Sequence, residues 1–369
     1  MGANCSLPDG TDLKAPEERI PHDLAVRANL ALVFVKPHAY APASIEFVRK
    51  ELTSVKGLAV LGECSQSGEQ IAEGDLVDKH YDVVASAALV AAPSEIEASD
   101  EKKAAFAEKF GQPWDDCVAN GSVLNAKDCA LSLGTPGDAE SGAEAEPMSE
   151  RDLLNLWLVA DKVKVAKDVY VAKVKGGGGD PDGDDYDEMS NAEGEAAVYC
   201  VNGFYPALKA QFTKPEASVR LFVVAFDPEV LSWAKFRAEV IGATNPADAA
   251  PSSIRAKMLA QHEALGMEEA PNNSNNGVHA SASPLEALKE RLIWLNFTLD
   301  SDPTGSKLVE LAVWDEAKRP VLDSLLENPP VDVAGMKGKA FDILEDKDTP
   351  DLYVLANNVA FAKELEGVC

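Results

Sequence analysis

The chain has 369 residues, of which 34 are basic and 62 acidic, so its formal net charge is −28 at pH 7. Its 46% hydrophobic and 26% charged content is typical of a soluble globular protein with a sizeable core. A chain this acidic is a poor general binder of nucleic acid phosphates, so no nucleic-acid partner is expected. No apolar run reaches the roughly 18 residues that a transmembrane helix needs.

Six cysteines are spread along the chain, and none forms a C-x-x-C pair. A zinc site of that kind is therefore not expected. The acidic stretch 175–195 lacks the central glycine and the final glutamate of a calcium-binding EF-hand loop. No metal bound by protein side chains is predicted. Because the cysteines are this sparse, we expect reduced thiols and a cytoplasmic location.

The first six residues, MGANCS, match the M-G-x-x-x-[ST] pattern for N-myristoylation at Gly2. One myristoyl chain binds a membrane only marginally, so stable tethering needs a second signal. Palmitoylation of Cys5 is the candidate, because no basic cluster follows. An unmodified start is the alternative. Residues 1–27 as a whole are predicted to form a polar arm punctuated by prolines.

Short apolar runs predict four strands, and periodic segments between them predict helices. The expected strands lie at residues 29–35, 58–64, 218–226 and 276–280. The expected helices lie at residues 43–52, 74–89, 228–242 and 284–295. The last of these begins at Pro284, and proline suits the first helical turn.

Two regions flank or interrupt this pattern. Residues 83–197 are acidic and are predicted to be partly helical, with helices at 100–110 and 151–170 and two low-complexity stretches. Residues 298–369 are patterned enough to pack on the main body. No internal repeat is found.

One histidine has the surroundings of a reactive group. His279 lies in NGVHASAS, where small residues follow it, and Glu290 comes eleven residues later on the next expected helix. A carboxylate that binds one ring nitrogen fixes the tautomer and lets the other nitrogen attack. A pair at this spacing is also common in ordinary structure.

Basic residues elsewhere in the chain favour a catalytic role for this pair. Arg237 and Arg255 flank a loop that contains Thr244, and Lys36 ends the first apolar strand. Two guanidinium groups and a hydroxyl suit a di- or triphosphate. Each cation taken alone would be an ordinary surface charge.

Several motifs occur in a distinctive order: Lys36-Pro37 after a strand, His80-Tyr81 at the end of a helix, GATNPADAAPSSIR at 242–255 and NGVHASAS at 276–283. In this order the chain resembles nucleoside diphosphate kinases, whose best-known stretches look like GxTNPxxxxPGTIR and NxxHGSDS. The resemblance covers residues 28–82 and 198–297. It implies an α+β fold, a ferredoxin-like four-stranded antiparallel sheet with helices, interrupted by the mostly helical insertion 83–197.

The resemblance also implies a role for each matching residue. His279 would accept the phosphoryl group, and Glu290 would orient it. Residues around the transferred phosphate and the ribose would be Lys36, Tyr81 and Asn276. Ligands of the other phosphates would be Arg237, Thr244 and Arg255. The base would stack on Phe204, and Ser281 would be the small hydroxyl residue beside the histidine.

The implied activity is transfer of the γ-phosphate of ATP or another nucleoside triphosphate to a nucleoside diphosphate through a phosphohistidine. Mg²⁺ would be carried by the nucleotide phosphates. Ala280 and Ala282 replace the family's Gly and Asp, and Ser252 replaces a Gly. The alternative is therefore an inactive, nucleotide-binding scaffold of a cytoskeletal or flagellar assembly. The insertion could serve a homo-oligomer or another protein partner, and base preference stays open.

Overall fold

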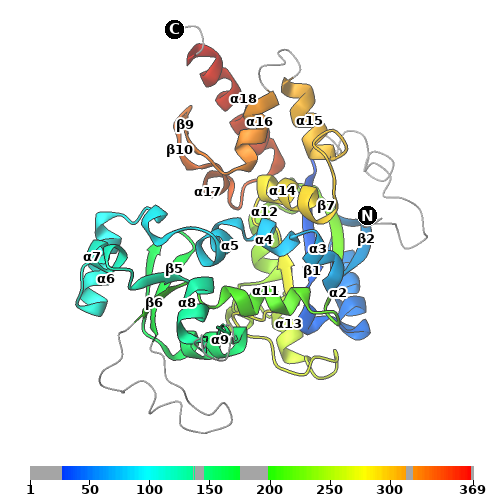
Figure 1. Cartoon of the computed structure of the whole chain (residues 1–369). Helices are drawn as coiled ribbons and strands as arrows, with labels where there is room; N and C mark the ends of the chain where they lie inside the picture. Colours follow the sequence, from blue (N-terminus) through cyan, green and yellow to red (C-terminus); the bar gives the residue numbers. More distant parts are fainter. Residues whose placement is uncertain (1–26, 136, 138–144, 175–197, 313–318, 367–369) are drawn as a thin grey trace. The chain divides into compact units, whose positions relative to one another are not determined.

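A computed structural model of the chain describes residues 27–135, 137, 145–174, 198–312 and 319–366 (Figure 1). The chain divides into two compact units, Met1–Gly74 with Pro215–Cys369, and Asp75–Lys214. The second unit begins before and ends after the insertion expected at 83–197, whose boundaries stay a prediction. The expected acylation sites, Gly2 and Cys5, lie outside the described residues.

The first unit is built on an antiparallel sheet with the strand order β2-β7-β1-β8. Its strands are β1 (Asn29–Val35), β2 (Leu58–Ser67), β7 (Ser218–Phe226) and β8 (Val278–Ala280). The first and third strands in chain order are central, which is the ferredoxin-like arrangement. The predicted fold class is therefore confirmed, and each predicted strand is found.

Helices cover both faces of this sheet. They are η2 (Pro37–Ala39), α2 (Pro42–Ser54), α3 (Gly68–Glu73), α12 (Trp233–Lys235), the π-helix η4 (Phe236–Ile241), η5 (Pro246–Asp248), α13 (Ile254–Ala260) and α14 (Pro284–Trp294). Val33 packs in a core cluster with Val48 of α2 and Met258 of α13. Successive strand residues point to opposite faces. Phe34 accordingly meets Trp294 of α14, with ring centroids 5.2 Å apart.

The C-terminal extension packs on the outer side of α14. Its elements are α15 (Pro303–Ala312), α16 (Arg319–Leu326), β9 (Pro330–Val333), β10 (Met336–Lys339), α17 (Ala340–Leu344) and α18 (Thr349–Glu366). Figure 1 shows these elements gathered beside α14. Leu285 and Leu288 of α14 join Leu322, Leu344 and Leu355 of the extension in a second apolar cluster. Residues of α14 therefore pack both in the core of the sheet and in the core of the extension.

A buried ion pair joins the extension to the sheet. Arg291 on α14 donates from Nε to Asp302 at 2.6 Å and from Nη1 to the carbonyl oxygen of Leu30 on β1 at 2.5 Å. Arg291 and Asp302 are both 0% exposed. The Asp302 carboxylate also accepts from the backbone N–H groups of Thr304 and Gly305 at the start of α15. All partners of this charge pair therefore lie inside the first unit.

The second unit has its own mixed sheet, in the order β3-β6-β5-β4. Its strands are β3 (Val123–Asn125), β4 (Lys162–Ala166), β5 (Val169–Val174) and β6 (Val198–Val201). Its helices are α4 (Leu76–His80), α5 (Asp82–Leu89), η3 (Pro93–Glu95), α6 (Asp100–Phe110), α7 (Trp114–Ala119), α8 (Ala126–Leu133), α9 (Glu150–Val159) and α11 (Tyr205–Thr213). The predicted helix over 151–170 is wrong beyond Val159, because a β4–β5 hairpin follows α9.

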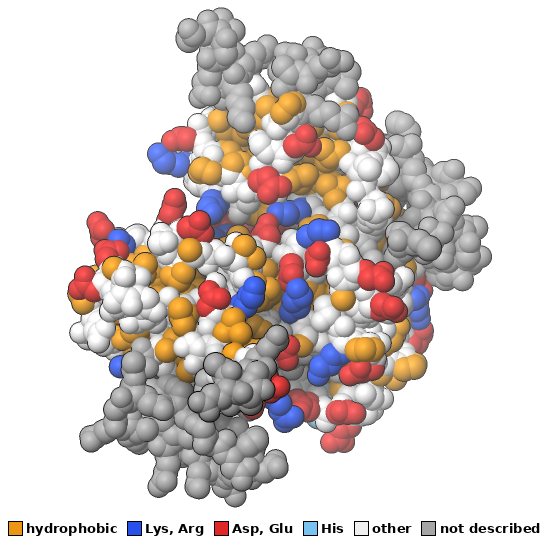
Figure 2. All heavy atoms as spheres, in the orientation of Figure 1, with side chains coloured by type: hydrophobic (Ala, Val, Ile, Leu, Met, Phe, Trp, Pro, Cys, Tyr) orange, Lys and Arg blue, Asp and Glu red, His pale blue; other side chains and the backbone are white. Residues whose placement is uncertain are grey.

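Three cysteines of the second unit, Cys117, Cys129 and Cys200, are buried free thiols. Cys64 on β2 is disulfide-bonded, so the expectation of reduced thiols is wrong there. Within the described residues, no helix is both long and apolar enough to span a membrane. On the face displayed in Figure 2, basic side chains lie scattered among acidic ones.

The buried ion pair predicts a large stability effect. Asp302→Ala would leave the Arg291 guanidinium buried without its counter-charge, which costs about 3–5 kcal/mol of unfolding free energy. Urea denaturation of the purified variant measures this loss. Asp332→Asn is the control, because Asp332 pairs with Lys337 on the exposed surface, and no measurable change is expected. Equal stabilities of the two variants would contradict the role given to the buried pair.

Candidate functional site

His279 lies on the edge strand β8, opposite Phe34 of the central strand β1. The imidazole stacks on the Phe34 ring with centroids 4.6 Å apart, and its side chain is 18% exposed. The chain enters β8 through Gly277, whose φ is +84°, and a Cβ there would lie 2.8 Å from Met258 Cε. Only glycine fits this backbone and this space. The strand therefore holds the imidazole in one place while part of it faces solvent.

Glu290 on α14 fixes the orientation of this ring. One carboxylate oxygen, Oε1, lies 2.7 Å from His279 Nε2. The other, Oε2, accepts from the Ser281 hydroxyl at 2.5 Å. That hydroxyl in turn accepts from the Leu32 N–H at 2.9 Å. The predicted residues His279, Glu290 and Ser281 are thus brought together in one chain of hydrogen bonds.

Two of the predicted cations adjoin the histidine strand. Lys36 follows β1 directly, and its backbone N–H donates to the Gly277 carbonyl at 2.9 Å. Burial, and secondly the nearby Arg255 guanidinium, lower the pKa of Lys36 to about 8. Arg255 donates to the carbonyl oxygens of Val278 and Gly242, each at 2.9 Å. Two cations that influence each other electrostatically in this way could both contact one anionic ligand.

His38 is a site residue that the sequence reasoning missed. Its Nε2 accepts from the Gly277 N–H at 3.0 Å. Burial, and then the charge of Lys36, lower its pKa to about 4. The ring is therefore neutral at pH 7, as an acceptor nitrogen requires. Its place directly after Lys36-Pro37 was the only available signal, and it did not distinguish a positioning residue from a loop residue.

Arg237 lies on the π-helix η4, and acidic residues of the extension contact it. Its Nη1 donates to Glu345 Oε1 at 3.0 Å and to Asp346 Oδ1 at 2.6 Å. π-helical turns are rare and occur often at functional sites. The Arg237 carbonyl accepts from the Gly242 N–H at 2.9 Å, which links this turn to the carbonyl that Arg255 contacts.

Asn276, at the end of the loop that precedes β8, contacts Thr244, which lies between η4 and η5. Asn276 is 3% exposed and donates from Nδ2 to the Thr244 carbonyl at 3.1 Å. Its Oδ1 is buried and has no hydrogen-bond partner among the described residues. An unpaired buried acceptor costs free energy unless a donor reaches it. The Thr244 side chain is exposed.

The substitutions relative to the family pattern cause no backbone strain. Neither Ala280 nor Ser252 has a positive φ, so neither position requires glycine. The Ala280 methyl group packs against the apolar cluster of the sheet. Ala282 accepts, through its carbonyl, a hydrogen bond from the Asp346 N–H at 3.2 Å.

Glu286 is a second residue that the sequence did not single out. It lies one turn before Glu290 on α14, and its backbone N–H donates to the capping hydroxyl of Ser283. Burial, and then the charge of Glu290, raise its pKa to about 7, with Glu345 adding to the rise and Arg237 opposing it. A glutamate in the first turn of a helix is ordinary, so nothing in the sequence distinguishes Glu286 from other helix-start glutamates.

Tyr81 and Phe204 belong to the second unit, and the hydrogen-bonded site described above consists of residues of the first unit. Tyr81 lies between α4 and α5, with its ring edge-on to His80 at a centroid distance of 4.4 Å. Phe204 precedes α11 and faces Trp157, with ring centroids 5.6 Å apart.

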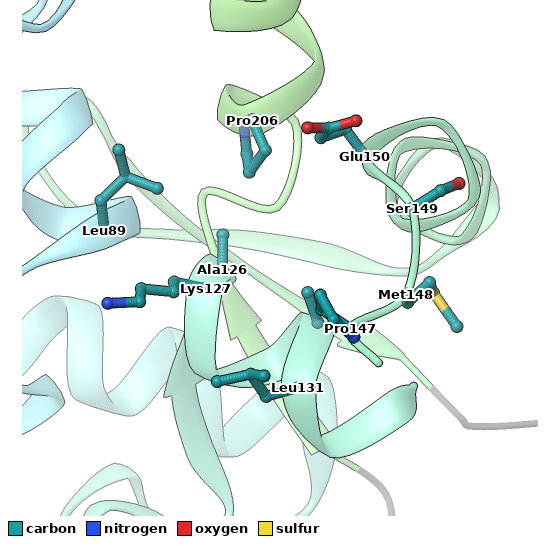
Figure 3. A pocket seen from close by; sticks show the side chains of 10 residues that line it. Leu89, Ala126, Lys127, Leu131, Pro147, Met148, Ser149, Glu150 and Pro206 are labelled. Atoms are coloured by element: carbon teal, nitrogen blue, oxygen red, sulfur yellow. The ribbon is translucent and has the colours of Figure 1, made fainter. Parts of the chain in front are cut away.

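The second unit also contains a pocket of about 440 Å³ (Figure 3). Its walls come from α5, α8, the start of α9 and the first turn of α11. Leu89, Leu131 and Pro206 point toward its interior in Figure 3. None of the predicted site residues lines it.

Comparison with solved structures finds similar chains at low identity. One is a nucleoside diphosphate kinase from Encephalitozoon cuniculi, with 12% identity, a TM-score of 0.33, and coverage of 74% of this chain and 92% of that chain. Another is an NDP kinase from Pyrobaculum aerophilum, with 13% identity, a TM-score of 0.30, and coverage of 74% and 98%. Similarity at this level is no evidence for a shared activity or for shared site residues. No protein-family model and no curated protein matches the chain.

The raised pKa of Glu286 predicts a pH-dependent stability. Between the usual pKa of a glutamate and about 7, the folded chain keeps a proton that the unfolded chain has lost. Stability therefore falls as pH rises through this window and stays lower above it. Glu286→Gln removes this penalty and is expected to raise the unfolding free energy at pH 8 by on the order of 1–3 kcal/mol.

Urea denaturation at pH 8 and at pH 4.5 measures this difference. At pH 4.5 the gain should largely vanish, because wild-type Glu286 is then protonated in the folded state. A gain of the same size at both pH values would contradict the assignment.

Proposed function

We propose that the chain is a phosphotransferase that moves the γ-phosphate of a nucleoside triphosphate to a nucleoside diphosphate through a phosphohistidine at His279. The observation that carries this proposal is the hydrogen bond between Glu290 and His279 Nε2. The two residues before His279, Val278 and Gly277, accept hydrogen bonds from Arg255 and from the Lys36 backbone. With Nε2 held by a carboxylate, Nδ1 is the nucleophilic nitrogen. An imidazole oriented in this way among cations is suited to attack on phosphorus.

The Nδ1 lone pair forms a bond to the γ-phosphorus, and the bond from that phosphorus to the bridging oxygen breaks. The diphosphate leaves with that electron pair. The proton on Nε2 stays shared with Glu290, whose negative charge offsets the positive charge that develops on the ring. The reverse reaction with a different diphosphate completes the cycle.

The remaining site residues would hold the nucleotide. Lys36 and Arg255 would neutralise phosphate oxygens, and Mg²⁺ would be carried by the same phosphates. The unpaired Asn276 Oδ1 would accept from a sugar hydroxyl. Arg237 and Thr244 would bind the other phosphates. Tyr81 and Phe204, as residues around the phosphate and under the base, stay predictions from the sequence resemblance.

A second function has one observation in its favour. Arg237, which would bind a nucleotide phosphate during the transfer, is ion-paired with Glu345 and Asp346. A chain that binds nucleotide without transferring phosphate, as a scaffold in a cytoskeletal or flagellar assembly, would tolerate this arrangement. Association with a membrane through Gly2 and Cys5 is compatible with either function and is proposed on the N-terminal pattern alone.

Phosphohistidine formation tests the proposal directly. The purified chain is incubated with γ-labelled ATP and Mg²⁺, and protein-bound label that is acid-labile and base-stable is measured. We expect this label in the wild type, its loss in His279→Ala, and its transfer to added GDP. His262→Ala is the matched control, because His262 contacts the Leu259 carbonyl and is no part of the site. Bound nucleotide without label would favour the scaffold.

The orienting role of Glu290 predicts a graded effect. Glu290→Gln keeps an oxygen near Nε2 but removes the charge that offsets the developing imidazolium, so the labelling rate should fall about 10- to 10³-fold. Single-turnover labelling with ATP in excess measures this rate. Glu268→Gln, at an exposed position, should label at the wild-type rate. An unchanged rate in Glu290→Gln would remove Glu290 from the mechanism.

A further inference from the structure

The acidic turn, defined as residues 345–348, joins α17 to α18 and has the sequence EDKD. It places Glu345 and Asp346 on the guanidinium of Arg237, at 3.0 and 2.6 Å. The carboxylate side chains are 55% and 48% exposed, and that of Arg237 is 32% exposed. These contacts are therefore accessible to solvent and to an incoming anion, unlike the buried pair of Arg291.

Other contacts fix the acidic turn independently of Arg237. Asp348 Oδ1 accepts from the Trp233 N–H at 2.8 Å and from Asn29 Nδ2 at 2.6 Å. Asn29 Oδ1 in turn accepts from the Thr349 N–H at 2.8 Å. The turn is thus attached to β1 and to the start of the helical segment that carries Arg237. It does not need the Arg237 ion pairs to stay in place.

A third anchor lies beside the histidine motif. The Asp346 N–H donates to the carbonyl of Ala282, three residues after His279. Asp346 has a φ of +60°, a left-handed conformation that is uncommon for residues other than glycine and is best tolerated by Asn and Asp. A local backbone cost at this point is consistent with a functional contact.

Three carboxylates interact with Arg237. Besides Glu345 and Asp346, the charge of Glu286 on α14 interacts with Arg237 and with Glu345. One guanidinium is therefore surrounded by three acidic side chains from two elements. A polyphosphate approaching Arg237 meets negative charge first, and it can bind there only by replacing carboxylate oxygens with phosphate oxygens.

We propose that the acidic turn is an autoinhibitory contact: Glu345 and Asp346 occupy the positions on Arg237 that phosphate oxygens of the nucleotide take when it binds. The inference rests on the proposed function for the assignment of Arg237 as a phosphate ligand. It adds that the C-terminal extension and the nucleotide compete for the same cation. Release of the turn from Arg237 is then the step that admits the nucleotide.

The test compares affinities for Mg-ADP by titration calorimetry of the full chain. Glu345→Gln with Asp346→Asn removes both charges, and Asn is compatible with the left-handed backbone at 346. Exposed ion pairs are weak, so Mg-ADP should bind about three- to tenfold more tightly to this double variant than to the wild type. Asp332→Asn, in the same extension but paired with Lys337, should bind like the wild type.

A second comparison isolates Arg237. In the background of Arg237→Gln, the two neutralising substitutions should change the affinity for Mg-ADP by less than about twofold. The guanidinium for which the carboxylates and the phosphates would compete is then absent. If the two substitutions still raise the affinity for Mg-ADP in the Arg237→Gln background, the gain comes from the lower negative charge of the chain as a whole. That result would overturn the inference. Equal affinities of the wild type and the double variant, or no Mg-ADP binding in any variant, would also overturn it.

The affinity test of the autoinhibitory contact is independent of the test of the proposed function, which measures phosphate label on His279. If Mg-ADP binds more tightly after neutralisation but His279 is never labelled, the autoinhibitory contact stands and the phosphotransfer fails. If His279 is labelled and the affinities do not differ, the phosphotransfer stands and the contact is merely structural.

Discussion

The buried ion pair between Arg291 and Asp302 connects the three parts on which the candidate site depends. Arg291 contacts a carbonyl of β1, lies on α14, and binds the loop that starts the extension. Two desolvated charges are tolerable only when they are well hydrogen-bonded, and here each nitrogen of the Arg291 guanidinium and each carboxylate oxygen of Asp302 has a partner. Because Glu290 is the preceding residue on the same helix, the position of its carboxylate depends on the same constraint.

Helix α14 contributes both to the two apolar cores and to the candidate site. Its apolar residues divide between the core of the sheet and the core of the extension. Its carboxylates Glu286 and Glu290 lie one turn apart, so they face the same side. Ser281 and His279 bind Glu290, while burial, and secondly repulsion from the Glu290 charge, raise the pKa of Glu286 to about 7. A single helix therefore orients the nucleophile and sets the charge beside it.

The sheet was predictable because its strands are short apolar runs with clear ends. Strands β1 and β7 match the predicted residues, and β2 continues three residues further, to Ser67. The helix expected at 228–242 was only partly right: it begins at Trp233 and continues as a π-helix, which a period of 3.6 residues cannot reveal. The segment KVKVA at 162–166 alternates with a period of two, which is a strand signal, and it forms β4 inside the range predicted to be helical.

The site was predictable to the extent that its residues lie in ordered motifs. His279, Glu290 and Ser281 meet as the spacing suggested, and Lys36 and Arg255 lie near each other at the end of β1. His38 and Glu286 were missed because neither residue type is unusual at its position. Their perturbed pKa values arise first from burial, which only the fold reveals, and secondly from the charges of Lys36 and Glu290 respectively. The acidic turn was invisible for the same reason, since it reaches Arg237 across more than one hundred residues.

The two cation groups of the site differ in a way that bears on how it works. Arg255 donates to the carbonyl oxygens of Gly242 and Val278, and burial lowers the pKa of Lys36 to about 8. Arg237 is instead partly neutralised by carboxylates of the extension. In the proposed binding mode, phosphate oxygens would reach Arg237 only by replacing the carboxylate oxygens of Glu345 and Asp346. The extension would then be a determinant of how a bound nucleotide is held, under either of the two proposed functions.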